Sequence, residues 1–281
     1  MRDELPRAVI RELVRTALLE DVGQGADVTS IATMGAETKG KAVIRARSAG
    51  VLCGLPLAEE VFRQIDPALS FRPALQDGDD LTVGQDVLSL EGSARSLLLG
   101  ERTALNFLGH LSGIASLTAR YVKAVEGKAA IAATRKTLPG LRFVQKYAVR
   151  CGGGLPHRLS LSDCAMIKDN HIAAAGSISE AIRRVRAYAG HTVKVEVEVD
   201  RLDQLLEALT ASPDIVLLDN MTPEELRQVV EITNGRAILE ASGGVTLETA
   251  PSIAESGVDV ISVGALTHSA PNLDLGMDWI S

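Results

Sequence analysis

Aromatic residues are scarce in this chain, and long apolar runs are missing. The 281 residues include one Trp, three Tyr and four Phe, too few for the stacking platforms that bind single-stranded nucleic acid. No apolar run approaches the roughly 20 residues that a membrane-spanning helix needs. Residues 1–21 alternate charged and apolar side chains at helical spacing, which is not the pattern of a signal peptide. We therefore expect a soluble, cytoplasmic protein.

Cysteine is also rare, and its spacing excludes two kinds of site. Cys53, Cys151 and Cys164 are widely separated, and no C-x-x-C pair occurs. An odd number at such spacing disfavours both a disulfide framework and a zinc site. We expect reduced thiols with structural roles. Because Cys151 and Cys164 flank the basic segment described next, a catalytic thiol stands as the alternative.

The chain is acidic overall, but its charge reverses in one segment. The sequence holds 29 Lys and Arg against 36 Asp and Glu, a net charge of −7. Between Thr134 and Lys168, seven bases stand against Asp163 as the only acid. Nucleic-acid phosphates usually require a basic face spread along a surface, so cations gathered this locally favour a compact polyanion. We predict that the ligand is a small phosphorylated or polycarboxylated metabolite.

The first hundred or so residues predict an α+β sandwich. Ala42, Ile44 and Ala46 alternate with Val43 and Arg45 as in a strand. A helix is expected at 56–65, and further strands at 70–75 and 87–90, which together suggest a sheet with helices on one side. A long helical segment at 94–126 then forms a hinge. We place the first domain at 1–112, with the tail 268–281 packing back on it, and the second at 113–267.

The second domain repeats strand, loop and helix. Strands are predicted at 129–133, 165–167, 193–199, 215–218, 237–239 and 258–263. Ser177 with Glu180, and Thr222 with Pro223 and Glu225, mark helix starts. Six or more alternating units of this length indicate a parallel sheet and favour a barrel over an open sheet.

Charged and glycine-rich positions fall at the predicted strand ends, where βα barrels carry their functional residues. These positions are Arg135 and Lys136, Lys168 with Asp169 and Asn170, Glu198, Asp219 with Asn220, Ser242 to Gly244, and Gly264. The runs ASGGVT and SVGALTHS each place backbone amides at a helix start, which favours an anion. The alternative is that each run is a simple tight turn, which would not require a bound ligand.

The strand VKVEVEVD predicts charge inside the barrel. Lys194, Glu196 and Glu198 share one face, and the intervening valines share the other. Buried charges of this kind need mutual pairing or a metal, unless the strand is a wet edge strand. Glu198 and Asp219, at neighbouring strand ends, could hold Mg²⁺ together with phosphate and water.

Three residues are ambiguous on sequence alone. His157 beside Arg158 is either an acid–base pair or a structural imidazole. Arg102 and His110 lie in a predicted helix, where such side chains usually belong to the surface or to a salt bridge.

The motifs resemble those of quinolinate phosphoribosyltransferases nearly end to end. The matching runs are ERTALN (101–106), GHLSG (109–113), TRKT (134–137), PGLR (139–142), KYAV (146–149), GGG (152–154), HR (157–158), IKDNH (167–171), LDN (218–220), ASGG (241–244) and SVGALTH (262–268), with Glu196 to Glu198. Ala133 and Pro156 depart from the family pattern, and Pro156 could reshape the loop that aims His157 and Arg158.

The resemblance implies an α+β open-faced sandwich joined to an incomplete α/β barrel, and a specific reaction. Members transfer the phosphoribosyl group of phosphoribosyl pyrophosphate to quinolinate with Mg²⁺, giving nicotinate mononucleotide, pyrophosphate and CO₂ in de novo NAD synthesis. They form homodimers, in which the Arg102 equivalent reaches the neighbouring subunit's site, and a higher homo-oligomer is open.

The resemblance also assigns roles to individual residues. The quinolinate pocket would comprise Arg102, Thr134, Arg135, Lys136, His157, Arg158 and Lys168. The phosphoribosyl pyrophosphate site would comprise Lys136, Glu198, Asp219, Ser242, Gly243, Gly244, Val263, Gly264, Ala265 and His268. Catalysis would fall to Lys136, Lys168, Glu198 and Asp219, the last two holding the metal. No nucleic-acid or membrane partner is implied.

Three other functions stand as rivals. The molybdenum-utilisation branch of the same superfamily shares the scaffold, although the intact TRKT and HR runs argue against it. A lyase could use Lys168 or Lys194 as a Schiff-base amine. A metabolite sensor would bind the same ligands without turnover.

Overall fold

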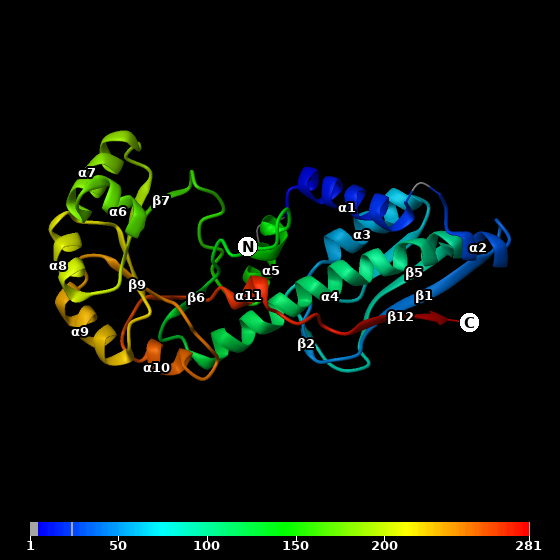
Figure 1. The fold of residues 1–281 in the computed structure, drawn as a ribbon. Helices are drawn as coiled ribbons and strands as arrows, with labels where there is room; N and C mark the ends of the chain where they lie inside the picture. Colours follow the sequence, from blue (N-terminus) through cyan, green and yellow to red (C-terminus); the bar gives the residue numbers. More distant parts are fainter. Residues whose placement is uncertain (1–4, 24, 281) are drawn as a thin grey trace. The chain divides into compact units, whose positions relative to one another are not determined.

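The computed structural model describes residues 5–23 and 25–280, which divide into two compact units (Figure 1). The first unit contains the described residues up to 117, with 150–152 and 270–280. The second contains 118–149 and 153–269. In the described residues, no helix combines the length and the apolar character needed to cross a membrane.

The first unit is built on an antiparallel sheet in the order β12-β1-β5-β3. Its strands are β1 (Lys39–Ala46), β3 (Ser70–Pro73), β5 (Asp86–Ser93) and β12 (Leu275–Ile280), with a separate pair formed by β2 (Gly50–Val51) and β4 (Asp80–Leu81). Its helices are α1 (Arg7–Val22), α2 (Val28–Thr33), α3 (Leu55–Ile65) and the first part of α4 (Ala94–Ala124). Ala42 and Ile44 are fully buried on one face of β1, as their alternation predicts.

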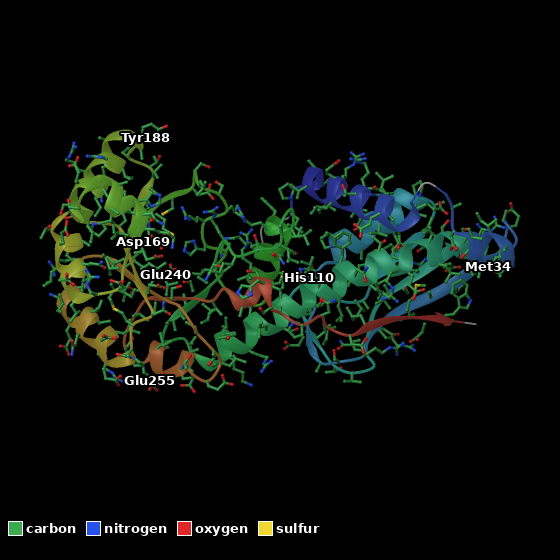
Figure 2. The ribbon with its side chains drawn as sticks, viewed as in Figure 1. Met34, His110, Asp169, Tyr188, Glu240 and Glu255 are labelled. Atoms are coloured by element: carbon green, nitrogen blue, oxygen red, sulfur yellow. The ribbon has the colours of Figure 1, made fainter. Side chains whose placement is uncertain are left out.

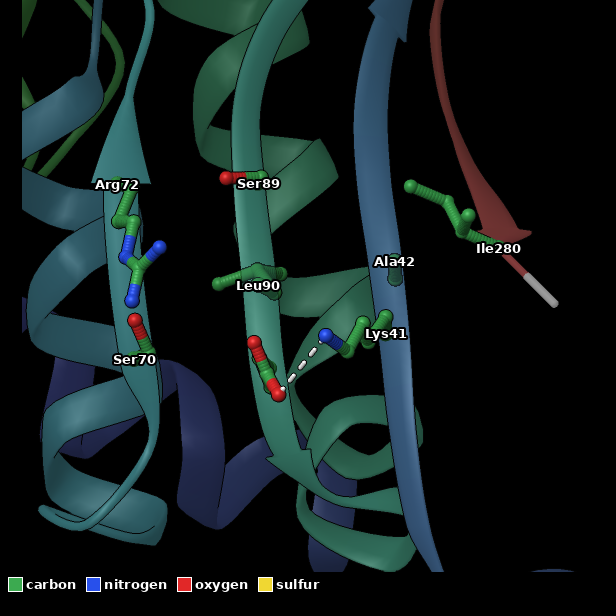
Figure 3. A pocket seen from close by; sticks show the side chains of 8 residues that line it. Lys41, Ala42, Ser70, Arg72, Ser89, Leu90 and Ile280 are labelled. Atoms are coloured by element: carbon green, nitrogen blue, oxygen red, sulfur yellow. Dashed lines mark ion pairs between the residues drawn. The ribbon is translucent and has the colours of Figure 1, made fainter.

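The opposite face of this sheet carries charged side chains (Figure 3). Lys41 and Glu91 are register partners on β1 and β5, and Lys41 Nζ lies 3.1 Å from Glu91 Oε1. Arg72 and Ser89 are register partners on β3 and β5. A sheet with one apolar and one polar face is the open-faced sandwich that the family resemblance implies.

The second unit is a parallel sheet in the order β6-β11-β10-β9-β8-β7. Its strands are β6 (Ala130–Ala132), β7 (Cys164–Ile167), β8 (Lys194–Val199), β9 (Ile215–Asp219), β10 (Ile238–Ser242) and β11 (Val260–Ser262). Its helices are the end of α4, most of α5 (Arg142–Cys151), α6 (Asp169–Ala175), α7 (Ile178–Tyr188), α8 (Leu202–Thr210), α9 (Pro223–Thr233), α10 (Ala250–Ala254) and α11 (Ala265–His268).

The strand order is that of an incomplete barrel. β6, first along the chain, pairs with β11, the last strand of this sheet. Within the described residues, β6 and β7 are not hydrogen-bonded, and β6 instead makes a parallel bridge from Ala132 to Leu155. Helices α7, α8 and α9 follow one another around the outside of the strands (Figure 1). The predicted incomplete barrel is therefore confirmed.

Most predicted elements are present, and three details differ. β10 continues to Ser242, beyond its predicted end at residue 239. The basic segment contains a helix, α5, that carries Arg142, Lys146 and Arg150 at a spacing of four residues, so only some of its bases follow strands. β8 lies between β7 and β9, so the interpretation of VKVEVEVD as an edge strand is wrong.

The helix-start signals behave as expected. Thr222 and Glu225 form a reciprocal capping box with Pro223 in the first turn. The Ser177 side chain accepts a hydrogen bond from the Glu180 amide. Such caps satisfy amides that a helix leaves unpaired, which fixes where α7 and α9 begin.

Candidate active site

Strand register gathers side chains from distant parts of the chain inside the barrel. Glu198 is the register partner of Leu217, which pairs in turn with Glu240, and Asp219 pairs with Ser242. Side chains two residues apart on a strand share a face, so Glu196 and Glu198 face inward with Glu240 and Ser242. Val195, Val197 and Val199 on the other face of β8 are buried, as predicted.

One cavity, the strand-end cavity, lies at the carboxyl ends of these strands and has a volume of about 300 Å³. It collects nine of the predicted site residues: Thr134, Arg135, Lys136, His157, Arg158, Lys168, Glu198, Asp219 and Ser242. Met166, Leu217, Glu240 and Ser262 complete its lining. The cations and acids that were predicted to converge at the strand ends therefore line one cavity of the barrel.

Other predicted residues lie beside this cavity rather than in its lining. A Cβ on Gly264 would stand 3.1 Å from Lys136 Cδ and 3.1 Å from His268 Nε2, so the backbone here passes close to both side chains. Gly243 adopts φ +95°, where a Cβ would strike the side chain of Asn220. Val263 is buried directly after β11, Gly244 follows Gly243 in the loop after β10, and Ala265 begins α11.

Arg102 belongs to the other compact unit. It lies on the part of α4 within the first unit and is exposed. His110 lies just over two turns further along the same helix, and burial lowers its pKa. The barrel interior therefore contains neither residue.

Two guanidinium donors in the strand-end cavity are buried without an acceptor. Arg135 Nε and Arg158 Nε have no hydrogen-bond partner among the described residues, and the same holds for Ser262 Oγ. Burial, with Arg158 and Arg142 nearby, lowers the pKa of Arg135. Since unpaired buried donors are costly, their convergence indicates a site built for an anion.

The acids inside the barrel divide into a partly exposed set and a buried set. Lys168 Nζ is hydrogen-bonded to Glu198 Oε2. The pairing predicted for the acids of β8 is therefore made, for Glu198, by Lys168 at the end of β7 and not by Lys194 on β8 itself. Asn220 Nδ2 donates to Asp219 Oδ2 at 3.0 Å. Glu198 and Asp219 offer hard carboxylate oxygens at adjacent strand ends, a donor set that fits Mg²⁺.

The buried set comprises Glu196 and Glu240, and the His157 ring lies beside both. Glu196 is 0% exposed and Glu240 is 4% exposed, and Figure 2 labels Glu240 amid the strands of the second unit. His157 Nε2 lies 3.2 Å from Glu240 Oε1 and 3.9 Å from Glu196 Oε1. Burial, and then the charge of Glu240, raises the pKa of Glu196 to about 7.

Sequence reasoning missed Glu240 and the role of Lys146. Glu240 lies two residues before Ser242 and therefore on the same strand face, but the predicted strand ended before it. Lys146 is 1% exposed, and its Nζ donates to the carbonyl oxygens of Pro156 and Arg158. Its spacing of four from Arg142 and Arg150 would have revealed the helix that carries it.

A second cavity, the lower cavity, occupies the barrel interior toward the amino ends of the strands. Its volume is about 560 Å³, and it shares His157, Arg158 and Glu240 with the strand-end cavity. Cys164 lines it, and burial followed by the charge of Glu196 raises the pKa of this thiol to about 11. A nucleophilic thiol needs a lowered pKa, so the alternative of a catalytic Cys164 is disfavoured.

Comparison with known proteins matches both units to one family. The family model for the N-terminal domain of quinolinate phosphoribosyl transferase matches residues 27–112, and the C-terminal domain matches residues 114–278. A nicotinate-nucleotide pyrophosphorylase (carboxylating) from Mycobacterium leprae is 47% identical, covering 95% of this chain and 96% of that protein. A probable nicotinate-nucleotide pyrophosphorylase (carboxylating) from Bacillus subtilis is 44% identical, covering 96% and 93%.

Solved structures agree in fold. The nicotinate-nucleotide pyrophosphorylase from Francisella tularensis is 38% identical with a TM-score of 0.95, covering 100% of this chain and 99% of that one. NadC from Streptococcus pyogenes is 44% identical with a TM-score of 0.95, covering 99% and 100%. Fold and matched domains define the class as two-domain pentosyltransferases. The chain belongs to the quinolinate phosphoribosyltransferase family.

Proposed function

We propose that this chain transfers the phosphoribosyl group of phosphoribosyl pyrophosphate to quinolinate, with decarboxylation, in de novo NAD synthesis. The products are nicotinate mononucleotide, pyrophosphate and CO₂. The observation that carries the proposal is the pair of buried, acceptor-free guanidinium Nε groups of Arg135 and Arg158 beside two partly exposed carboxylates in one cavity. Family membership adds the identity of the substrates.

The cations of the cavity suit a planar dicarboxylate. Two carboxylates on adjacent ring carbons need several fixed donors, and arginine offers a planar fork. Arg135 and Arg158 would bind them together with Lys168, while Thr134 and His157 complete the pocket. The pyridine nitrogen is itself the nucleophile, so a Ser or Cys nucleophile is not needed.

The other side of the cavity would bind the phosphoribosyl compound. Glu198 and Asp219 would stabilise positive charge that builds on the ribose ring as pyrophosphate departs. Lys136, which is exposed, would lie near the departing pyrophosphate. The amides of the 242–244 and 263–265 loops, with His268, would bind the 5-phosphate. Once the nitrogen is quaternised, the ring accepts the electrons left by CO₂, and the protein chiefly fixes the ring.

Glu198 and Asp219 would also hold the metal that we propose as cofactor. Mg²⁺, when bound, neutralises charge on the pyrophosphate. Asn220 donates to Asp219, which orients that carboxylate, and Lys168 does the same for Glu198. A ligand set this small suits an ion that keeps waters and substrate oxygens in its shell.

Two rival activities find less support. An imine-forming lysine works best as a desolvated, neutral amine, but the Lys168 side chain is 44% exposed and paired with Glu198. Lys194 is exposed and lines the lower cavity. The molybdenum-linked branch would require a different ligand in a cavity whose cations already suit quinolinate.

The decisive experiment is turnover of the purified protein with quinolinate, phosphoribosyl pyrophosphate and Mg²⁺. We expect nicotinate mononucleotide and CO₂ in equal amounts, activity lost on chelation, and activity recovered when Mg²⁺ is added back. Product formation that continues unchanged in the presence of a chelator would contradict the assignment of Mg²⁺ as cofactor, but not the assigned reaction. Tight binding of both substrates without product would favour a sensor.

A homodimer in the cytoplasm is part of the same proposal, with residues 1–112 and 268–281 as one domain and 113–267 as the catalytic one. In this arrangement Arg102 would complete the quinolinate pocket of the neighbouring subunit. Arg102→Ala and Lys136→Ala subunits, each inactive alone, should then complement when they are refolded together. About a quarter of wild-type activity is expected, because about half of the dimers are mixed and each mixed dimer has one intact site. Verified mixed dimers without activity would refute the sharing of sites.

A further inference from the structure

We propose that Glu240 is a positioning residue: through the His157 ring it holds the turn that presents Arg158 to the substrate. The inference rests on the proposed function for the identity of the substrate, and on the geometry of residues 156–158 for everything else. It makes His157 a link between Glu240 and Arg158 rather than a hydrogen-bond donor to the substrate.

The turn at His157 has an uncommon backbone. His157 adopts φ +56°, in the left-handed region that few non-glycine residues occupy. The backbone N–H of Arg158 donates to His157 Nδ1 at 2.7 Å, so the ring folds back onto the amide that follows it. A backbone held in this region needs support from its surroundings. This contact supplies support and fixes the start of Arg158 relative to the ring.

The contact also determines which ring nitrogen carries the proton. Because Nδ1 accepts a hydrogen bond, it carries no proton, and the neutral ring must carry its proton on Nε2. The nearest acceptor for Nε2–H is Glu240 Oε1 at 3.2 Å, since Glu196 Oε1 at 3.9 Å is beyond hydrogen-bond range. The carboxylate of Glu240 therefore fixes both the tautomer and the ring orientation.

This tautomer excludes a metal among the buried acids. His157, Glu196 and Glu240 each offer one ligand atom within 4.8 Å of the others, which is the geometry of a possible ion site. A metal ligand must present an unprotonated nitrogen. Nε2 carries the proton here, so the cluster is a hydrogen-bonded support.

Lys146 holds the same turn from its other side. Its Nζ donates to the carbonyl oxygen of Arg158 at 2.6 Å and also to that of Pro156. The peptide group before His157 and the peptide group after Arg158 are therefore anchored to α5, while the His157 ring is anchored to β10. Such double support restricts the backbone from which the Arg158 side chain extends.

The Arg158 guanidinium is fixed in turn. Nη1 donates to the Cys164 carbonyl oxygen at 3.0 Å, and Nη2 lies 3.2 Å from Met166 Sδ, a weak acceptor. Nε has no acceptor among the described residues. A donor that shifts by about 1 Å no longer matches its ligand. Arg158 is assigned to binding of the substrate carboxylates and not to bond making, so loss of the Glu240 support should weaken binding of the carboxylate ligand more than it slows chemistry.

The first test compares two substitutions of Glu240. Glu240→Leu removes the acceptor, and we expect the KM for quinolinate to rise about tenfold, with a smaller change in kcat and in the KM for phosphoribosyl pyrophosphate. Glu240→Gln keeps a carbonyl oxygen that accepts from Nε2–H, so its quinolinate KM should stay within about threefold of wild type. Glu231→Gln, at an exposed position on α9, is the matched control. An unchanged KM in Glu240→Leu, or equal losses in both Glu240 variants, would overturn the inference.

The second test does not depend on turnover. Nitrogen NMR of ¹⁵N-histidine protein distinguishes the protonated from the unprotonated ring nitrogen, and His157→Asn assigns the signal among the five histidines. We expect the proton on Nε2 of His157. A proton on Nδ1, or on both nitrogens, would refute the proposed link from Glu240 through His157 to Arg158, even in a fully active enzyme. An inactive wild-type protein with the expected tautomer would refute the proposed function instead of the role of Glu240. Because the NMR measurement uses the wild-type protein, it can be made even if Glu240→Leu fails to fold.

Discussion

The four-stranded sheet of the first unit and the barrel of the second both carry charged side chains on one strand face, with opposite consequences. On the open face, Lys41 and Glu91 pair at 3.1 Å with side chains 62% and 50% exposed (Figure 3). In the barrel the equivalent positions face inward, and Glu196 and Glu240 are buried. Exposed pairs gain little because water screens them, whereas unpartnered buried charges are costly. Interior charges therefore depend on particular partners, and those partners define the site.

The largest expected effect is on the interior cations. Arg158→Ala should raise the quinolinate KM by roughly a hundredfold to a thousandfold, because it removes several charged donors in a shielded site. Arg135→Ala should act in the same direction. The comparison is with Arg72→Ala on the open face of the first sheet, for which steady-state kinetics should match wild type. Unchanged quinolinate affinity in both interior variants would sink the pocket assignment.

A smaller effect is expected from the buried amine on α5. Burial first, and then Arg142 and Arg158, lowers the pKa of Lys146 to about 8. The unfolded chain then binds more protons between about pH 8 and 10.5, so this group makes the free energy of unfolding rise with pH over that interval. The gain should be about 1 to 3 kcal/mol. Lys146→Met lacks this group, so denaturant unfolding of both proteins at pH 7.5 and 10 isolates it.

The sign of this effect is its sharpest feature. An ordinary exposed lysine would leave the difference between wild type and Lys146→Met constant from about pH 7.5 to 9. A wild type that loses stability relative to the variant as the pH rises would mean that the ammonium form is favoured at this position. The charge-assisted contacts to Pro156 and Arg158 would then outweigh burial.

The smallest effect is expected on the open face of the first sheet. A double-mutant cycle on Lys41→Ala and Glu91→Ala should give a coupling free energy below about 1 kcal/mol that shrinks further in high salt. Equilibrium unfolding at low and high ionic strength provides the measurement. Coupling of several kcal/mol would show that this face is shielded from solvent in the assembled protein, and would remove the contrast with the barrel.

Patterns along the strands made much of the site predictable. Alternation in VKVEVEVD placed the valines outward and the acids inward, and strand ends located Lys168, Glu198 and Asp219. These inferences succeed because the period of a strand is a local property. The prediction of the end of β10 was wrong for a local reason too. Glu240 and Ala241 are residue types with weak strand propensity, so the predicted strand stopped before them.

Pairing between strands could not be predicted in the same way. Lys194 was the cation expected on the same strand face as Glu198, yet the partner is Lys168 at the end of β7. Lys146 lies on a helix, and its two acceptors lie 10 and 12 residues further on. Distances of this kind depend on register and on the path of loops, which residues far apart in the sequence determine together.

The sequence by itself determined the alternation of strands and helices, the inward face of each strand and the group of charges at the strand ends. Side-chain periodicity and caps are local properties that the chain carries with it. Only the tertiary structure decided that His157 meets Glu240 across an interval of 83 residues, and therefore which ring nitrogen holds the proton. The contact forms because strands β6 to β11 close around one interior. This closure places the loop after β6, which carries His157, against the inward face of β10, which carries Glu240.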